Sequence, residues 1–189
     1  MQLQRYQLSI TEAQLSAYDS HTERRLADLA GYFADAAAYQ ARLATADPVL
    51  YTVYNTERPA AAGDLISGIT LLHAGQIGDE YFMTKGHFHA VRATAEVYYC
   101  LRGTGVMVLE AETGTSHVEP FPTGSVIHIP PGWAHRTVNV GDDDLLFFWV
   151  CPANAGHDYG TIAERGFRER ITTAHPVVAQ LRDLSSARH

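Results

Sequence analysis

Along most of the chain, apolar and β-branched residues occur in short runs separated by Gly, Pro, Asn or Asp. Runs of this length and composition are typical of β-strands. Several runs are apolar at every position, so one face can line a barrel interior while helices or a second subunit cover the other. The expected strands are residues 49–55, 65–73, 96–102, 105–110, 125–129, 135–140 and 145–151.

The region before these strands follows a different period. Residues 11–46 carry a helical spacing, in which Leu26 and Leu29 fall on one face. Ser20 and Glu23 form a capping-box pattern just ahead of that face. This spacing predicts a packing helix with a solvated, charged side.

Together these elements predict an all-β dominated fold of the jelly-roll β-barrel kind. We expect a single domain over residues 1–189, with a helical N-terminal extension in 1–47 and the barrel core in 48–167. The weakly patterned tail, 168–189, predicts a short C-terminal helix with a loose end.

The composition and charge narrow the classes of function and partner that the protein can have. Hydrophobic residues make up 46% and the formal net charge is −7, which is typical of a globular protein and argues against a nucleic-acid partner. No apolar stretch reaches the length of a membrane span, and the start lacks the pattern of a secretory signal. We therefore expect a cytoplasmic protein with no membrane partner. Cys100 and Cys151 lie in apolar runs and predict two buried thiols, with a disulfide as the lesser alternative.

Ten histidines are more than surface positions normally supply, and three of them fall in informative places. His87 and His89 flank one residue, so both side chains point the same way if the segment is extended. Glu96 follows after a six-residue gap, and His135 lies in a separate Gly- and Pro-rich block. Three imidazoles and a carboxylate are donors that a divalent metal prefers. The spacing predicts one divalent ion per chain at these four residues.

These motifs resemble those of the cupins. Gly103 stands seven positions after Glu96, and the second block reads Gly124, Pro130, Gly132, His135 and Asn139 in the cupin order. The stretches TKGHFH, AGHDYG and WAHRTVNVG, and the long gap before Glu96, are similar to the cupin-type phosphoglucose isomerases first met in archaea. The resemblance covers about residues 48–167.

This resemblance implies an aldose–ketose isomerase that interconverts glucose-6-phosphate and fructose-6-phosphate. Glu96 would be the catalytic base as well as a metal ligand. Tyr98, two residues on and on the same face, would hydrogen-bond the sugar or relay a proton, and His157 would act at ring opening. Iron(II) is the metal that the family implies, while manganese, nickel and zinc also fit these ligands.

The family holds its substrate through hydroxyls and backbone amides. The matching positions in this chain are Tyr51, Thr70, Thr84, Gly86 and Tyr159. One departure is Cys151, where the family usually has a tyrosine before the proline. A tyrosine hydroxyl would be lost from the substrate site, unless the position belongs to the core.

Two other functions fit the same motifs. A sugar- or metabolite-binding cupin would hold the metal without turnover, and a cupin dioxygenase or decarboxylase would use it for oxygen chemistry. Turnover of a sugar phosphate distinguishes the isomerase from the binding protein, and oxygen uptake distinguishes it from the dioxygenase or decarboxylase. Because several strand faces away from the site are apolar, we also expect a homodimer, with a sheet face or an exchanged N-terminal strand at the interface.

Overall fold

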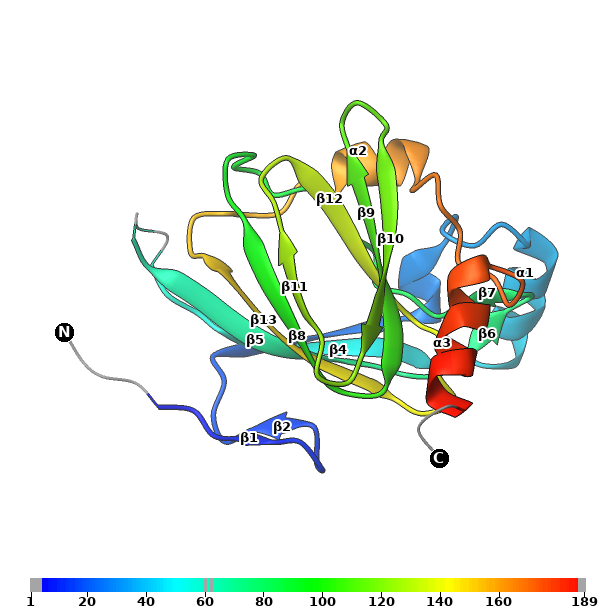
Figure 1. Cartoon of the computed structure of the whole chain (residues 1–189), viewed down its shortest axis with the longest axis horizontal. Coiled ribbons are helices and arrows are strands. Elements are labelled where there is room, and N and C mark those ends of the chain that lie inside the picture. The colour runs from blue at the N-terminus through cyan, green and yellow to red at the C-terminus, as the bar shows by residue number, and fades with distance from the viewer. Residues whose placement is uncertain (1–4, 60, 62, 187–189) are drawn as a thin grey trace.

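The computed structural model describes residues 5–59, 61 and 63–186. Two antiparallel sheets face each other and enclose the core (Figure 1). The large sheet has the order β11-β8-β13-β5-β4-β3, and the small sheet has the order β10-β9-β12. The strands of the large sheet are β3 (Ser20–Arg25), β4 (Val49–Thr56), β5 (Leu65–Leu72), β8 (Glu96–Arg102), β11 (Val126–Ile129) and β13 (Leu145–Pro152). Those of the small sheet are β9 (Thr104–Ala111), β10 (Ser116–Pro122) and β12 (Trp133–Asn139).

This architecture confirms the predicted jelly-roll class, and the seven expected strands are present within a few residues of their predicted ends. Strand β10 was not predicted. It contains Pro120 and Pro122 and alternates polar and apolar residues. The prolines are tolerated because β10 lies at the edge of its sheet, where a missing donor breaks no inner ladder.

The N-terminal helix is shorter than its pattern predicted. Residues Ser20–Arg25 form strand β3, so the capping-box pattern does not start a helix there. Leu26–Leu29 form one 3-10 turn, and the α-helix of this region is α1 (Ala36–Thr45), capped by the Asp35 side chain. The side chains of β3 alternate between half-buried and exposed, and none of them is apolar, which removes the period-2 signal from the sequence.

The remaining elements are short helices and two hairpins outside the two main sheets. Helices α2 (Gly160–Arg165) and α3 (Pro176–Ser186) follow the last strand, and α3 supplies the predicted C-terminal helix. The loose end expected beyond it, 187–189, lies outside the described residues. Short hairpins are formed by β1 (Leu8–Ser9) with β2 (Gln14–Leu15) and by β6 (Gln76–Ile77) with β7 (Glu80–Tyr81). No helix of the described chain is long and apolar enough to cross a membrane.

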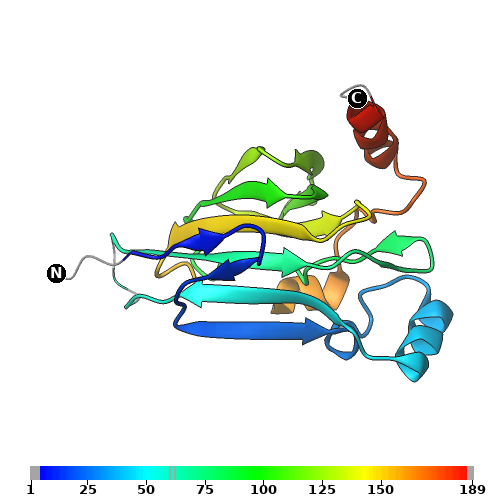
Figure 2. The same cartoon turned by 90° about the horizontal axis from the view of Figure 1, so that it is seen from below.

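The core between the sheets is rich in aromatic side chains, with Phe88, Phe121 and Phe147 almost fully buried. Cys100 and Cys151 are both buried and free, so the disulfide alternative is wrong. A second, smaller apolar cluster is built around Ile69 on the other face of the large sheet. The β1–β2 hairpin packs there, across the outside of the sheet (Figure 2).

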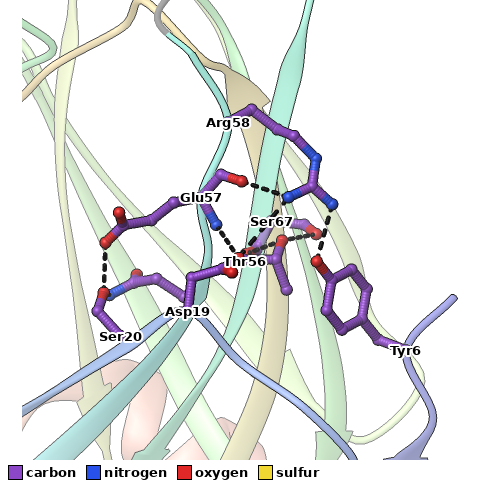
Figure 3. Close-up of polar contacts among 8 residues, drawn as sticks. Tyr6, Asp19, Ser20, Thr56, Glu57, Arg58 and Ser67 are labelled. Atoms are coloured by element: carbon purple, nitrogen blue, oxygen red, sulfur yellow. Dashed lines mark hydrogen bonds and ion pairs between the residues drawn. The ribbon is translucent and has the colours of Figure 1, made fainter. Parts of the chain in front are cut away.

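A polar cluster anchors the N-terminal arm to the end of strands β4 and β5 (Figure 3). Arg58 donates to the Tyr6 hydroxyl at 2.8 Å and lies 3.7 Å from the Asp19 carboxylate. The same carboxylate accepts the backbone N–H of Glu57 at 2.7 Å. These contacts fix the entry into β3, the strand that forms one edge of the large sheet.

Candidate functional site

Three segments carry the predicted metal ligands to the inside of the barrel. His87 and His135 face each other in an isolated β-bridge, in which each backbone N–H donates to the other's carbonyl. His89 lies two residues after His87, and Glu96 begins strand β8. Ligand atoms of these four side chains all lie within 4.8 Å of one another. The predicted donors therefore form one cluster.

The charge of this cluster resides on Glu96. Burial alone would raise the pKa of Glu96, but the adjacent imidazoles of His135 and His89 outweigh burial and lower the pKa to about 2. Its Oε2 lies 2.9 Å from His135 Nε2 and 3.1 Å from His89 Nε2. Burial first, and the neighbouring histidines second, lower the pKa of His87 well below 6.5. At neutral pH the cluster thus holds a carboxylate beside a neutral His87 imidazole.

The hydrogen bonds of the imidazoles test whether a metal fits. His89 Nδ1 lies 2.8 Å from the Thr94 hydroxyl and 3.2 Å from the Thr94 carbonyl, so this nitrogen can donate to Thr94. Nε2 is then the nitrogen that faces the other ligands, 3.1 Å from Glu96 Oε2. Neither ring nitrogen of His135 makes a well-aligned hydrogen bond within the described residues, although the side chain is only 2% exposed. Nε2 has the Glu96 carboxylate beside it at 2.9 Å, and Nδ1 has no such neighbour in the described part of the chain. A buried imidazole without hydrogen bonds is costly unless a ligand satisfies it. These four residues therefore fit a divalent cation.

The cluster opens into a pocket of about 270 Å³ between the sheets. Every site residue predicted from the sequence lines this pocket except His89, which belongs to the same ligand cluster. The lining residues that were predicted are Tyr51, Thr70, Thr84, Gly86, His87, Glu96, Tyr98, His135, His157 and Tyr159. The structure thus brings together residues that span more than a hundred positions in the sequence.

Aromatic rings form the pocket wall beside the cluster. The ring of His87 lies 4.6 Å from that of His135 and 4.4 Å from that of His157, and His157 stacks on Tyr159. Burial lowers the pKa of His157, so this imidazole is also neutral near pH 7. Burial, and then the charge of Glu96, raise the pKa of Tyr98 well above 10, which keeps its hydroxyl protonated.

Gly86 lets the backbone approach the pocket closely. Its φ is +72°, and a Cβ at this position would lie 2.5 Å from the Phe167 ring and 2.9 Å from the His135 carbonyl. Any larger residue would displace the loop that carries Thr84 and His87. The glycine therefore shapes the pocket wall next to the cluster.

The sequence did not single out Arg92, which holds two site loops together. Its guanidinium donates to the His89 carbonyl and to the Asp158 carboxylate, and it also binds Glu112 at 2.7 Å. Asp158 follows His157 and accepts from the Thr161 hydroxyl at the start of α2. Asp158 belongs to the AGHDYG stretch that the sequence motifs include. The need of this carboxylate for a positively charged partner is the signal that could have indicated Arg92.

The neutral state of His87 predicts acid sensitivity of the metal-free protein. In the unfolded chain this histidine binds a proton below about pH 6.5, whereas its lowered pKa prevents protonation in the fold. We expect the free energy of unfolding to fall as pH drops below about 6.5, by up to about 1.4 kcal/mol per pH unit. The lowered pKa of Glu96 acts with the same sign, in the window from 4.5 down to about 2.

Melting temperatures of metal-free wild type and His87→Gln, measured between about pH 7.5 and 5, check this expectation. The variant should show a shallower decline. His117 is exposed, so His117→Gln should follow the wild-type curve. A wild-type curve that is flat below pH 6.5 would contradict it.

An antiparallel double-sheet barrel that gathers three imidazoles and a carboxylate inside defines a protein of the cupin class. A family model described as "Glucose-6-phosphate isomerase (GPI)" matches residues 23–184. The chain belongs to this glucose-6-phosphate isomerase family, as the sequence motifs predicted.

Individual relatives agree with this assignment. The glucose-6-phosphate isomerase of Pyrococcus horikoshii is 49% identical over 148 residues, 78% of each chain. That of Pyrococcus furiosus has the same identity and coverage. A putative glucose-6-phosphate isomerase 2 of Rhizobium meliloti is 40% identical over 85% of this chain and 80% of its own length. Likeness to solved structures is weaker: the oxalate decarboxylase of Bacillus subtilis has 18% identity and a TM-score of 0.46, over 71% of this chain and 32% of that one.

Proposed function

We propose that this chain, as a glucose-6-phosphate isomerase, interconverts glucose-6-phosphate and fructose-6-phosphate in the pocket around Glu96. The observation that carries the proposal is the meeting of one ionised, buried carboxylate with three imidazoles inside a pocket lined by hydroxyls. Such a pocket offers a proton acceptor and hydrogen-bond donors to an open-chain sugar.

We propose His87, His89, Glu96 and His135 as the metal ligands, and iron(II) as the ion. When bound, the ion supplies Lewis acidity toward adjacent hydroxyl and carbonyl oxygens of the sugar. The buried ring nitrogens of His135, which make no hydrogen bond within the described residues, support this ligand set. The carboxylate and the imidazoles would also hold one another in place before the ion binds, because His89 Nε2 and Glu96 Oε2 are 3.1 Å apart.

Glu96 would move the proton between C1 and C2 of the sugar. Its lowered pKa keeps the carboxylate in the acceptor form at neutral pH. Tyr98 would donate its hydroxyl hydrogen to a sugar oxygen, since its raised pKa keeps that hydrogen in place. His157 is neutral, so one ring nitrogen can accept a proton from the ring hydroxyl as the sugar ring opens.

The phosphate would lie against the hydroxyls and backbone on the opposite wall. Lys85 N–H donates to the Tyr51 hydroxyl at 3.3 Å, and the Thr84 hydroxyl accepts from the backbone of Thr137 at 3.1 Å. Both hydroxyls thus retain their own hydrogen for a phosphate oxygen. Thr70, Gly86 and Tyr159 complete this proposed set.

A coupled isomerase assay on metal-stripped protein tests the proposal, with each divalent ion added back separately. We expect no turnover without metal and the highest turnover with iron(II). Oxygen consumption without sugar-phosphate turnover would favour the dioxygenase alternative. Tight sugar-phosphate binding without turnover under every ion would favour the binding-protein alternative.

Cys151 packs in the core and is not one of the described residues that line the pocket. Burial raises the pKa of its thiol to about 12, and the charge of Glu96 adds to this shift. We expect Cys151→Tyr to overfill this position and lower stability by about 1–3 kcal/mol. KM for glucose-6-phosphate should stay unchanged. Thermal melts and steady-state kinetics check the two expectations, and a lower KM with an unchanged melt would place the residue in the substrate site instead.

We also propose that the protein is a homodimer, with the outer face of the large sheet at the interface. On that face Val126 pairs with Tyr99, and these side chains are 66% and 41% exposed. Burying such apolar neighbours is favourable. Light scattering at micromolar concentration should report twice the chain mass of 20.8 kDa, and a mass of 20.8 kDa would contradict the dimer.

A further inference from the structure

One arginine reaches the pocket from the edge of the large sheet. Of the described residues that line the pocket, Arg24 is the one with a permanent positive charge. It belongs to strand β3, opposite Tyr51 of β4, one of the residues proposed to hold the phosphate. The sequence motifs did not include it, because β3 lies ahead of the part of the chain that carries them.

The backbone of β3 directs the side chains of Arg24 and Arg25 to different surroundings. The register of β3 against β4 shifts between these two residues, as in a β-bulge, which re-aims side chains. Arg25 donates to the Asp47 carbonyl at 3.0 Å and lies 3.4 Å from Glu23. Arg24 instead shares the inward face of β3 with Thr22, which also lines the pocket.

Other cations near the pocket are already engaged. The guanidinium of Arg136 is buried, and it donates from Nε and Nη2 to the Lys85 carbonyl. It also stacks 4.4 Å from the Phe167 ring. The ammonium of Lys85 lies 5.9 Å from the ring of Tyr32. Neither of these two side chains is a described lining residue of the pocket.

Arg24 differs from these two cations in the described part of the chain. Within residues 5–59, 61 and 63–186, no hydrogen bond or ion pair holds its guanidinium, although the residue is half-buried. Burial raises the pKa values of Tyr51 and Tyr159, and the positive charge of Arg24 counteracts both shifts, so its field reaches across the pocket. A half-buried cation without a partner, in a pocket with neutral hydroxyls around it, is suited to an anionic ligand.

Resting on the proposed function, we propose that Arg24 binds the substrate's phosphate group and makes the enzyme select phosphorylated over neutral sugars. Glu96 lies on β8, and Arg24 lies on β3 at the edge of the same sheet, with β13, β5 and β4 between them. A hexose 6-phosphate has the same layout, since its reacting carbons and its phosphate stand at opposite ends of the chain. The guanidinium fork matches phosphate oxygens, and Tyr51 and Thr70 line the same pocket.

Steady-state kinetics of Arg24→Gln against Arg25→Gln tests this assignment. We expect Arg24→Gln to raise KM for glucose-6-phosphate about 10- to 100-fold, the range of a charge-assisted hydrogen bond, with kcat changed less than about threefold. Arg24→Lys should recover part of the loss because it restores the charge without the fork. Arg25→Gln removes an equal charge one residue away, on a side chain bound outside the pocket, and should leave KM unchanged.

A binding measurement separates this inference from the proposed activity. Trp149 lines the pocket, so its fluorescence can report binding of inorganic phosphate without turnover. Wild type and Arg25→Gln should bind phosphate alike, and Arg24→Gln about 10- to 100-fold more weakly. If the wild type has no isomerase activity but still binds phosphate more tightly than Arg24→Gln does, the proposed function is overturned and Arg24 is upheld as the anion ligand. Equal phosphate affinity in wild type and a folded Arg24→Gln, or equal losses in both arginine variants, would overturn the assignment.

Discussion

Replacement of Glu96 by glutamine is expected to lower kcat about 10²- to 10⁴-fold, the usual contribution of a general base. The substitution keeps the size of the side chain and one oxygen toward the histidines, but it removes the proton acceptor. Glu96 can fill this role because its carboxylate is ionised at neutral pH and lines the pocket, although the residue is only 5% exposed. Metal content, measured by elemental analysis, should change far less than kcat.

A second buried glutamate provides the matched control. Glu110 is 0% exposed, lies on β9 and binds Arg165, away from the pocket. Glu110→Gln should lower the melting temperature, because it weakens a buried ion pair, and leave kcat of the folded enzyme near wild type. Near-normal turnover of Glu96→Gln would reassign the proton acceptor to Tyr98 or His157, or favour a hydride shift between C1 and C2.

Removal of two imidazoles in the His87→Ala, His135→Ala double variant is expected to abolish metal binding and, with it, metal-ion catalysis, so activity should fall at least about 10²-fold. The two residues face each other across the β-bridge, so the variant removes half of the four-ligand set from one place. A chelator should have the same effect on the wild type, and circular dichroism should show that the barrel persists. Its core of buried aromatic and aliphatic side chains extends over both sheets, well beyond the four ligands.

Exposed histidines supply the control for this pair. His117 and His128 lie on strands β10 and β11, outside the described pocket lining. The His117→Ala, His128→Ala double variant should retain wild-type metal content and activity. Full metal occupancy in the His87→Ala, His135→Ala variant would rule out the proposed ligand set.

Much of the fold could be predicted because its inner strands are apolar. The runs that become β5 and β13 pair with each other and lie inside the large sheet, so their sequences are almost continuously hydrophobic. Strand β10 was not predicted because it contains prolines, which argue against an inner strand but are tolerated at the edge of a sheet. Strand β3 was not predicted because its inward side faces a polar pocket, so its sequence does not alternate between apolar and polar residues.

The sequence by itself determined the family, the jelly-roll class and the residue types of the metal-ligand cluster. This was possible because two short motifs, whose spacing is set by local chain geometry, contain all four ligands: His87, His89, Glu96 and His135. Only the tertiary structure decided what surrounds them. Arg24 reaches the pocket through the pairing of β3 with β4, so nothing near it in the sequence marks its role. Burial and the neighbouring charges likewise hold Glu96 ionised and His87 neutral, and both depend on side chains that meet only after the two sheets have closed over the site.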